Sequence, residues 1–410
     1  MSSAFRARLR RRVETENDNR ASALELFYDL VFVFAVTQVS HLLLEHLTWE
    51  GAAQAALCLL VLWWAWNYTT WFTNELDPTA IAVRVVLIGL MLASLLMAVA
   101  IPEAFGAHGL LFAGSYVAIQ VGRQSFLTFV ASERGTMEAR RSGRILIWFA
   151  AAGTLWLAGG VAEDGLRWGL WLAALGLDYL APLVRYRVPG LPPLGLDAWE
   201  VETSHFSERF QLFVIIALGE SIVVTGVTTS EGALDAATVV AFGLAFLATA
   251  AFWWLYFDYV ARIAERRLEL AENRTQLARD AYTYLHVVLI AGVIVAAVGD
   301  ELVIAHPTDE LAGPELAAVV AGPALYLLGH VALRLRMTGT VSVKRLLGAI
   351  ACLAVAPIGL VAPALVVAAL LLAVLVAVIV AERLAAARRA ARGDQTPLER
   401  LEATQRLQSS

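Results

Sequence analysis

The stretch from Pro363 to Ala381 reads PALVVAALLLAVLVAVIVA and contains no charged residue. This is the length of a helix that crosses about 30 Å of hydrocarbon, which takes roughly 20 apolar residues. The whole chain of 410 residues has the same character: 59% of its residues are apolar, 16% are charged and its mean hydropathy is +0.67. A soluble domain has about 45 to 50% apolar and about 25% charged residues. The composition therefore excludes a soluble globular protein and predicts a polytopic membrane protein.

Working outward from that stretch, apolar runs of similar length recur along the chain. Backbone groups in lipid must bond within their own segment, so the runs are expected to be helices and the fold all-α. We expect about twelve transmembrane helices, at 24–47, 51–73, 80–101, 109–131, 144–162, 166–184, 208–228, 236–260, 281–304, 314–335, 342–361 and 363–383.

The Lys and Arg residues supply the predicted orientation. Six arginines precede the first span and six follow Ile379, and the other large groups lie at 134–144, 185–187, 262–279 and 334–345. All six groups fall on one side of a twelve-span topology, while the opposite loops hold only Arg167. Because cytoplasmic loops are enriched in Lys and Arg, the pattern predicts a plasma (inner) membrane protein with both termini in the cytoplasm.

A proline-rich segment divides the predicted spans six and six. The expected organisation is a cytoplasmic Arg-rich N-terminus at 1–23, a first half at 24–184, a linker at 185–207, a second half at 208–383 and a cytoplasmic tail at 384–410. The sequence VVLI occurs at 85–88 in span three and again at 287–290 in span nine. An even number of spans gives both halves the same orientation, so the pattern predicts two parallel six-helix repeats with any substrate path between them.

Two motifs carry a family resemblance: ELFYDLVFVF at 25–34 and HFSERFQLFVIIALGES at 205–221. On these motifs the chain resembles the bacterial low temperature requirement protein A family, over nearly its whole length. The resemblance implies a polytopic fold and marks four signature acids, Glu25, Asp29, Glu208 and Glu220. It implies no substrate and no reaction.

Glu220 is the most conspicuous candidate functional residue. Its place in span seven predicts a carboxyl near the bilayer midplane, where an acid costs about 2.5 to 3.5 kcal/mol on insertion scales. A functional role in a substrate or ion pathway and a role as an inert helix-packing residue both remain open. The adjacent Gly219 and nearby Gly226 predict a close approach of another helix.

The first span carries two acids on one face. Glu25 and Asp29 are four residues apart. Ser22 and Glu25 also form a capping-box pattern, in which Glu25 only caps the helix start. Gln38 lies on the same span, at the position that aligns with Glu220 in the proposed repeat.

The remaining candidates are single buried groups. Arg123 in span four predicts an ion pair with Glu220 or Asp29. His286 in span nine is either a proton relay or a hydrogen-bonded packing residue. The aromatic cluster at 63–71 and Asp178 are both expected at the membrane interface.

Together these features predict a secondary transporter or permease rather than an enzyme, possibly coupled to protons through a midplane carboxyl. The expected partners are membrane lipids and an unknown small solute or proton, with a homo-oligomer possible. No cofactor, metal or nucleic-acid motif is present. Two alternatives stay open: an integral-membrane enzyme acting on lipid or isoprenoid-like substrates, with polar groups such as His205 at the cytoplasmic interface, and a non-catalytic membrane sensor or scaffold.

Overall fold

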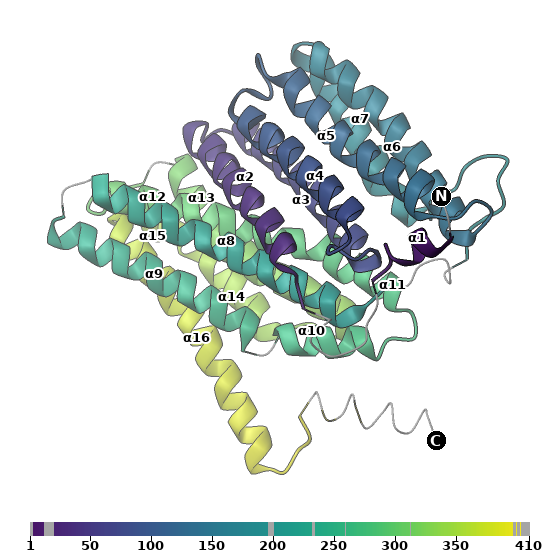
Figure 1. Cartoon of the computed structure of the whole chain (residues 1–410). Helices are drawn as coiled ribbons and strands as arrows, with labels where there is room; N and C mark the ends of the chain where they lie inside the picture. The colour runs from purple at the N-terminus through teal and green to yellow at the C-terminus, as the bar shows by residue number, and fades with distance from the viewer. Residues whose placement is uncertain are drawn as a thin grey trace. The chain divides into compact units, whose positions relative to one another are not determined.

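In the computed structural model, all regular structure in the described part of the chain is helical (Figure 1). The structure describes residues 3–11, 20–195, 201–231, 234–258, 260–311, 313–396, 399 and 402. The chain forms two compact units. Unit 1 comprises 1–42 and 50–209, and unit 2 comprises 43–49 and 210–410.

Unit 1 is built mainly from six long helices. Its elements are α1 (Ser3–Ala7), α2 (Ala23–Glu45), α3 (Trp49–Glu75), α4 (Ile81–Ala100), η2 (Ile101–Glu103), α5 (Gly109–Phe126), η3 (Leu127–Ala131), α6 (Met137–Val161), α7 (Asp164–Leu183) and the start of α8 (Thr203–Glu231). Helices α4 to α7 pack in chain order, each against the next. Arg167 is the one Lys or Arg in the loops predicted on the opposite side. Its guanidinium donates to the carbonyls of Ala104, Gly106 and Ala162, which gives this cation a structural role.

Unit 2 contains the rest of α8 and the later helices. These are α9 (Ala236–Phe257), α10 (Val260–Glu269), α11 (Arg274–Leu277), η5 (Ala278–Leu285), α12 (His286–Ala305), α13 (Gly313–Thr338), α14 (Val343–Ala354), α15 (Ala356–Gly359) and α16 (Ala364–Ala391). The tightest pair is α12 with α13: a Cβ added to Gly322 would lie 2.4 Å from the backbone nitrogen of Ala296. Glycines at this crossing therefore bring two helix backbones into contact.

Each predicted span coincides with a helix, and the differences have local causes. Helix α6 begins at Met137, before the predicted start at 144, because Thr136 caps it by accepting the N–H of Ala139. The predicted span 342–361 is split into α14 and α15 near Pro357, which lacks the N–H needed to continue the helix.

Eight helical segments of the described chain are long and apolar enough to cross a membrane. They are Ala23–Glu45, Ile81–Glu103, Met137–Val161, Thr203–Ser230, Ala236–Glu269, Arg274–Ala305, Gly313–Thr338 and Ala364–Ala391. The fold is therefore that of a multi-pass α-helical membrane protein.

The prediction that another helix approaches closely at Gly219 and Gly226 is wrong. A Cβ at either glycine would meet no described atom within 4 Å. The contacts of this kind lie between α12 and α13 instead, where Gly292, Gly299, Gly322 and Gly329 would each place a Cβ within 3.0 Å of the partner helix.

Candidate functional site

A buried arginine in unit 1 lies between two buried carboxylates. Arg209 Nη2 donates to Asp29 Oδ1 over 2.6 Å, and Arg209 Nη1 lies 3.4 Å from Glu25 Oε1. The three residues are at most 2% exposed. Since Glu25 and Asp29 are one helical turn apart on α2, they present both acids to the same cation. A single positive charge is thus shared by two negative ones.

The two oxygens of Glu25 have different roles. Oε2 accepts the backbone N–H of Ser22 over 2.8 Å, while the Ser22 hydroxyl accepts the N–H of Glu25 over 3.3 Å. This is the predicted capping box. Oε1 faces the other way and receives the Nε2–H of His205 over 2.9 Å. The helix cap therefore uses only one of the two carboxylate oxygens of Glu25, Oε2.

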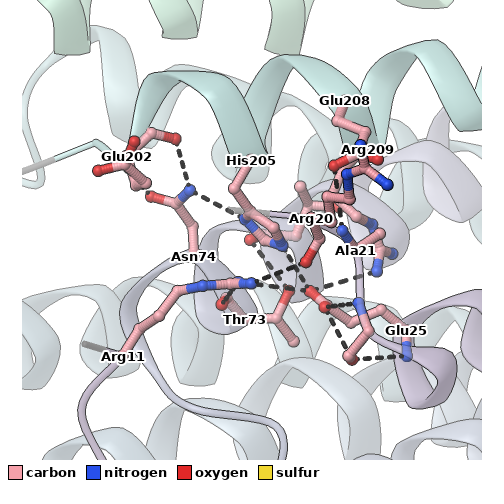
Figure 2. A network of polar contacts seen from close by, with 12 residues as sticks. Arg11, Arg20, Ala21, Glu25, Thr73, Asn74, Glu202, His205, Glu208 and Arg209 are labelled. Carbon is pink, nitrogen blue, oxygen red and sulfur yellow. Dashed lines mark hydrogen bonds and ion pairs between the residues drawn. The ribbon is translucent and has the colours of Figure 1, made fainter. Parts of the chain in front are cut away.

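His205 is oriented from its other side by Asn74 of α3. Asn74 Nδ2 is 3.2 Å from His205 Nδ1 and also donates to the Glu202 carbonyl over 2.9 Å, while Asn74 Oδ1 accepts the N–H of Glu202 over 3.0 Å. An amide nitrogen only donates and a carboxylate only accepts, so the contacts fit an imidazole that carries its proton on Nε2. Figure 2 shows His205 pointing toward Glu25 from α8.

Arg11, from the Arg-rich N-terminus, also contacts the cluster. Arg11 donates to the carbonyls of Thr73 over 3.0 Å and Arg20 over 3.1 Å, and its Nη1 lies 3.9 Å from Glu25 Oε1 (Figure 2). Its side chain is 9% exposed. Burial lowers the pKa of Arg11, and the negative charge of Glu25 opposes that shift. Arg11 therefore packs against the cluster, a structural role that the prediction of a cytoplasmic N-terminus did not include.

Asp29 keeps one oxygen without a partner. Oδ1 accepts both the Arg209 guanidinium and the indole N–H of Trp66 over 2.9 Å. Oδ2 has no hydrogen-bond partner among the described residues, and neither has Arg209 Nε. An ionised carboxylate accepts hydrogen bonds on both oxygens, so Oδ2 of Asp29 could accept a further hydrogen bond.

Arg123 belongs to a second buried network of unit 1, and its predicted pairing with Asp29 or Glu220 is wrong. In the described structure it donates to Ala65 O, to Thr69 Oγ1 and to Gln120 Oε1, which are all neutral acceptors. Its π contacts are with Tyr68 and Phe149. The arginine is therefore held by dipoles and aromatic rings, which need no carboxylate partner.

The same network corrects the interfacial prediction for Asp178. Gln120 donates to the Tyr116 hydroxyl, and Asp178 Oδ2 accepts both Tyr116 over 2.8 Å and the Trp156 indole over 3.0 Å. Asp178 is 2% exposed. The prediction of an interfacial aromatic belt at 63–71 is also wrong for Trp63, Trp64 and Trp66, which are at most 1% exposed.

Of the remaining predicted residues, Glu208 lies in the polar network drawn around Glu25 (Figure 2). In unit 1, Glu208 accepts the N–H of Ala21 over 3.0 Å, and Gln38 is half-buried on α2. In unit 2, Glu220 is fully buried on α8, and His286 bonds the Tyr256 hydroxyl over 3.0 Å and the Ala281 carbonyl over 2.9 Å. In the part of the chain that the structure describes, no group of three His, Cys, Asp or Glu side chains could hold a metal ion.

Four members of the cluster were not predicted from the sequence: Arg209, Arg11, Asn74 and Trp66. A signal existed for Arg209, which stands four residues after His205 inside the second motif and so shares its helical face. No pattern identified its carboxylate partner, 180 positions away in the chain.

The long apolar helices and the buried charges between them define a multi-pass membrane protein with a polar interior. The chain belongs to the bacterial low temperature requirement A protein (LtrA) family, whose model matches residues 20–380. Among curated proteins, it is similar to an uncharacterised protein of Rhizobium meliloti (strain 1021), with 37% identity over 319 residues, or 78% of either chain. No solved structure matches the chain.

Proposed function

We propose that the protein is a secondary transporter of a small solute, coupled to protons through the carboxylates around Arg209. The observation that carries the proposal is the sharing of Arg209 between Glu25 and Asp29 in a site closed to solvent. Buried ionisable groups in membrane helices are costly and usually functional.

Proton binding at Asp29 would change the helix contacts at this site. Two unit charges 4 Å apart interact by about 4 kcal/mol at an effective dielectric constant near 20. Neutralising Asp29 removes most of that attraction and leaves Arg209 with Glu25, on the same helix face. Because Arg209 stands on α8 and both acids stand on α2, losing one of the two ion pairs weakens the contact of α8 with α2. Such a step couples proton occupancy to a helix movement.

The wider architecture proposed here has twelve spans in two parallel halves, with both termini on the cytoplasmic side of the inner membrane. The grouping of Lys and Arg supports this orientation. Four of the twelve segments are not among the eight strongly apolar helices, and they contain buried polar residues that polar neighbours can shield. Glu220, Gln38 and His286 remain proposed pathway residues.

The test is solute-driven proton movement in proteoliposomes that contain the purified protein and the internal pH indicator pyranine. Amino acids, small carboxylates, sugars and amines are added in turn with the membrane potential clamped. At least one class should change the internal pH with the native protein and not with Asp29→Asn. Asp235→Asn is the matched control, because Asp235 is an exposed helix cap and asparagine caps equally well. An unchanged response in Asp29→Asn would remove this site from the coupling.

A further inference from the structure

A small cavity in unit 2 contains a single ionisable group. Helices α9, α12, α13 and α16 surround a space of about 20 Å³, and its wall includes Phe252, Asp300, Val319, Pro323 and Leu371. A cavity needs about 10 to 15 Å³ of this kind of volume to hold a water molecule. Every described lining residue except Asp300 is apolar. The space therefore suits one water molecule beside one carboxyl group.

Asp300 differs from the buried acids of unit 1 in having no partner. Its side chain makes no hydrogen bond or ion pair with any described residue, and the residue is half-buried among the apolar side chains of the cavity. Asp29 and Asp178, by contrast, each accept two donors. An unpaired carboxylate among apolar side chains is costly, whereas a protonated carboxyl carries no charge. The surroundings of Asp300 therefore favour a bound proton.

The residue next to Asp300 lies against the neighbouring helix. Gly299 packs on α13 so closely that a Cβ there would lie 2.9 Å from the Cα of Val319. Pro323, four residues after Val319, has no N–H to donate to the Val319 carbonyl. Val319 and Pro323 both line the cavity beside Asp300, so this interrupted part of α13 forms one of its walls.

We propose that Asp300 is a proton-binding site of unit 2, with one water molecule in the cavity. A metal cation fits less well, because hard cations take about six or more oxygen ligands and Asp300 is the one described lining residue with an oxygen-bearing side chain. The faces of α9, α13 and α16 on the cavity present no titratable side chain. The nearest titratable residues along the chain are Glu301 on α12, Glu315 on α13, and the exposed pair His306 and Asp309.

The position of Asp300 indicates the side from which the proton arrives. It stands five residues before the end of α12 at Ala305 and fourteen after His286, about 21 Å at helical rise. The opposite end of this helix pair carries the ion pairs of Asp280 with Arg279 and Arg336, on the predicted cytoplasmic side. The proton would therefore enter from outside. This site is independent of the role proposed for Asp29.

A hydrophobic carbodiimide tests the site, since such a reagent adds to a protonated carboxyl in an apolar environment. Purified protein in liposomes is treated with dicyclohexylcarbodiimide, and its peptides are analysed by mass spectrometry. The adduct is expected on Asp300 in the native protein and in Glu301→Gln, and on no residue of that peptide in Asp300→Asn. Replacing potassium chloride by sodium chloride should leave the labelling rate unchanged. Protection by sodium would overturn the proposal in favour of a cation site.

An infrared measurement gives an answer that does not require reagent access. The difference spectrum between native protein and Asp300→Asn near neutral pH should contain the C=O stretching band of a protonated carboxylic acid. A carboxylate band in its place would overturn the proposal, whatever the labelling result. Asp29→Asn should leave the Asp300 band unchanged, so that failure of this proposal is distinguishable from failure of the transport mechanism.

Discussion

The cluster around Arg209 in unit 1 and the pair of helices α12 and α13 in unit 2 differ in how their ionisable groups are partnered. In unit 1 the buried acids Glu25 and Asp29 share Arg209, so each acid has an opposite charge beside it. In unit 2, inside the helices α12 and α13, Asp300 has no partner and neither ring nitrogen of His330 bonds to a described residue. Removing one member of a buried ion pair leaves its partner as an uncompensated charge and destabilises the protein. Removing an isolated group leaves no such charge behind. The comparison predicts which substitutions each unit tolerates.

The largest expected effect is the loss of the shared cation. Arg209→Met leaves the buried Asp29 without a cation and leaves Glu25 with only Arg11 and His205, which should lower the free energy of unfolding by about 3 to 5 kcal/mol. The matched control is Arg383→Met, because Arg383 also lies 2.6 Å from an acid, Asp258, but with 55% of its side chain exposed. That exposed pair should contribute about 0 to 1 kcal/mol. Unfolding in detergent, followed by fluorescence, measures both.

A combined variant sharpens this result. Changing Glu25→Gln, Asp29→Asn and Arg209→Met together removes all three charges. Arg11 then loses its carboxylate neighbour Glu25 but keeps its hydrogen bonds to two backbone carbonyls. Stability should return to within about 1 kcal/mol of the native protein, as happens when buried ion triads are replaced as a set. A triple variant that is less stable than Arg209→Met alone would contradict the charge account.

Unit 2 should instead be sensitive to the spacing of its helix backbones. Gly322→Ala places a Cβ 2.4 Å from the backbone of Ala296, and backbone atoms cannot give way as a flexible side chain can. Overpacking of this kind costs about 1 to 3 kcal/mol. Gly219→Ala, where the new Cβ meets nothing within 4 Å, is the control and should be neutral or slightly stabilising. Equal losses in the two variants would contradict the packing of α12 against α13.

A smaller effect is expected for the indole that orients Asp29. Trp66→Phe keeps most of the ring but removes the N–H that donates to Asp29 Oδ1. A hydrogen bond to a charged group contributes about 1.5 to 3 kcal/mol. In the Asp29→Asn background, the same substitution should cost less, because the acceptor no longer carries a full charge. A cycle of the two single variants and the double variant measures this coupling, and a coupling of zero would refute the contact.

The smallest effect is expected for the isolated histidine of unit 2. His330→Leu removes two nitrogens that bond to no described residue, so stability should be unchanged or slightly higher. His286→Leu instead leaves the Tyr256 hydroxyl without its acceptor and should cost about 1 to 3 kcal/mol. If both leucine variants lost the same stability, the distinction between partnered and isolated groups in unit 2 would be wrong.

The multi-pass helical fold could be predicted from the sequence because a helix that crosses lipid needs a long apolar run, and eight described segments have one. The local part of the site was also predictable: the four-residue spacing of Glu25 and Asp29 placed them on one face, and Ser22 with Glu25 specified the cap. Which arginine meets those acids was not predictable. Arg123 and Arg209 are both buried, and only the tertiary packing brings Arg209 to α2.

The aromatic cluster and Asp300 show the same limit. Trp66 in the sequence is typical of an interfacial belt, but its indole N–H is buried against a carboxylate whose position the sequence does not specify. Asp300 gave no sequence signal because its distinctive feature is the absence of partners. That property depends on the side chains of three other helices.

The central claim is that Asp29 exchanges a proton while Arg209 changes its partner. The most direct test records charge displacement by proteoliposomes on a solid-supported membrane after rapid acidification of the surrounding solution. The account predicts a transient current with the native protein and with Asp235→Asn, and loss of the Asp29 component of that current in Asp29→Asn. A current of the same size and pH dependence in Asp29→Asn would contradict it.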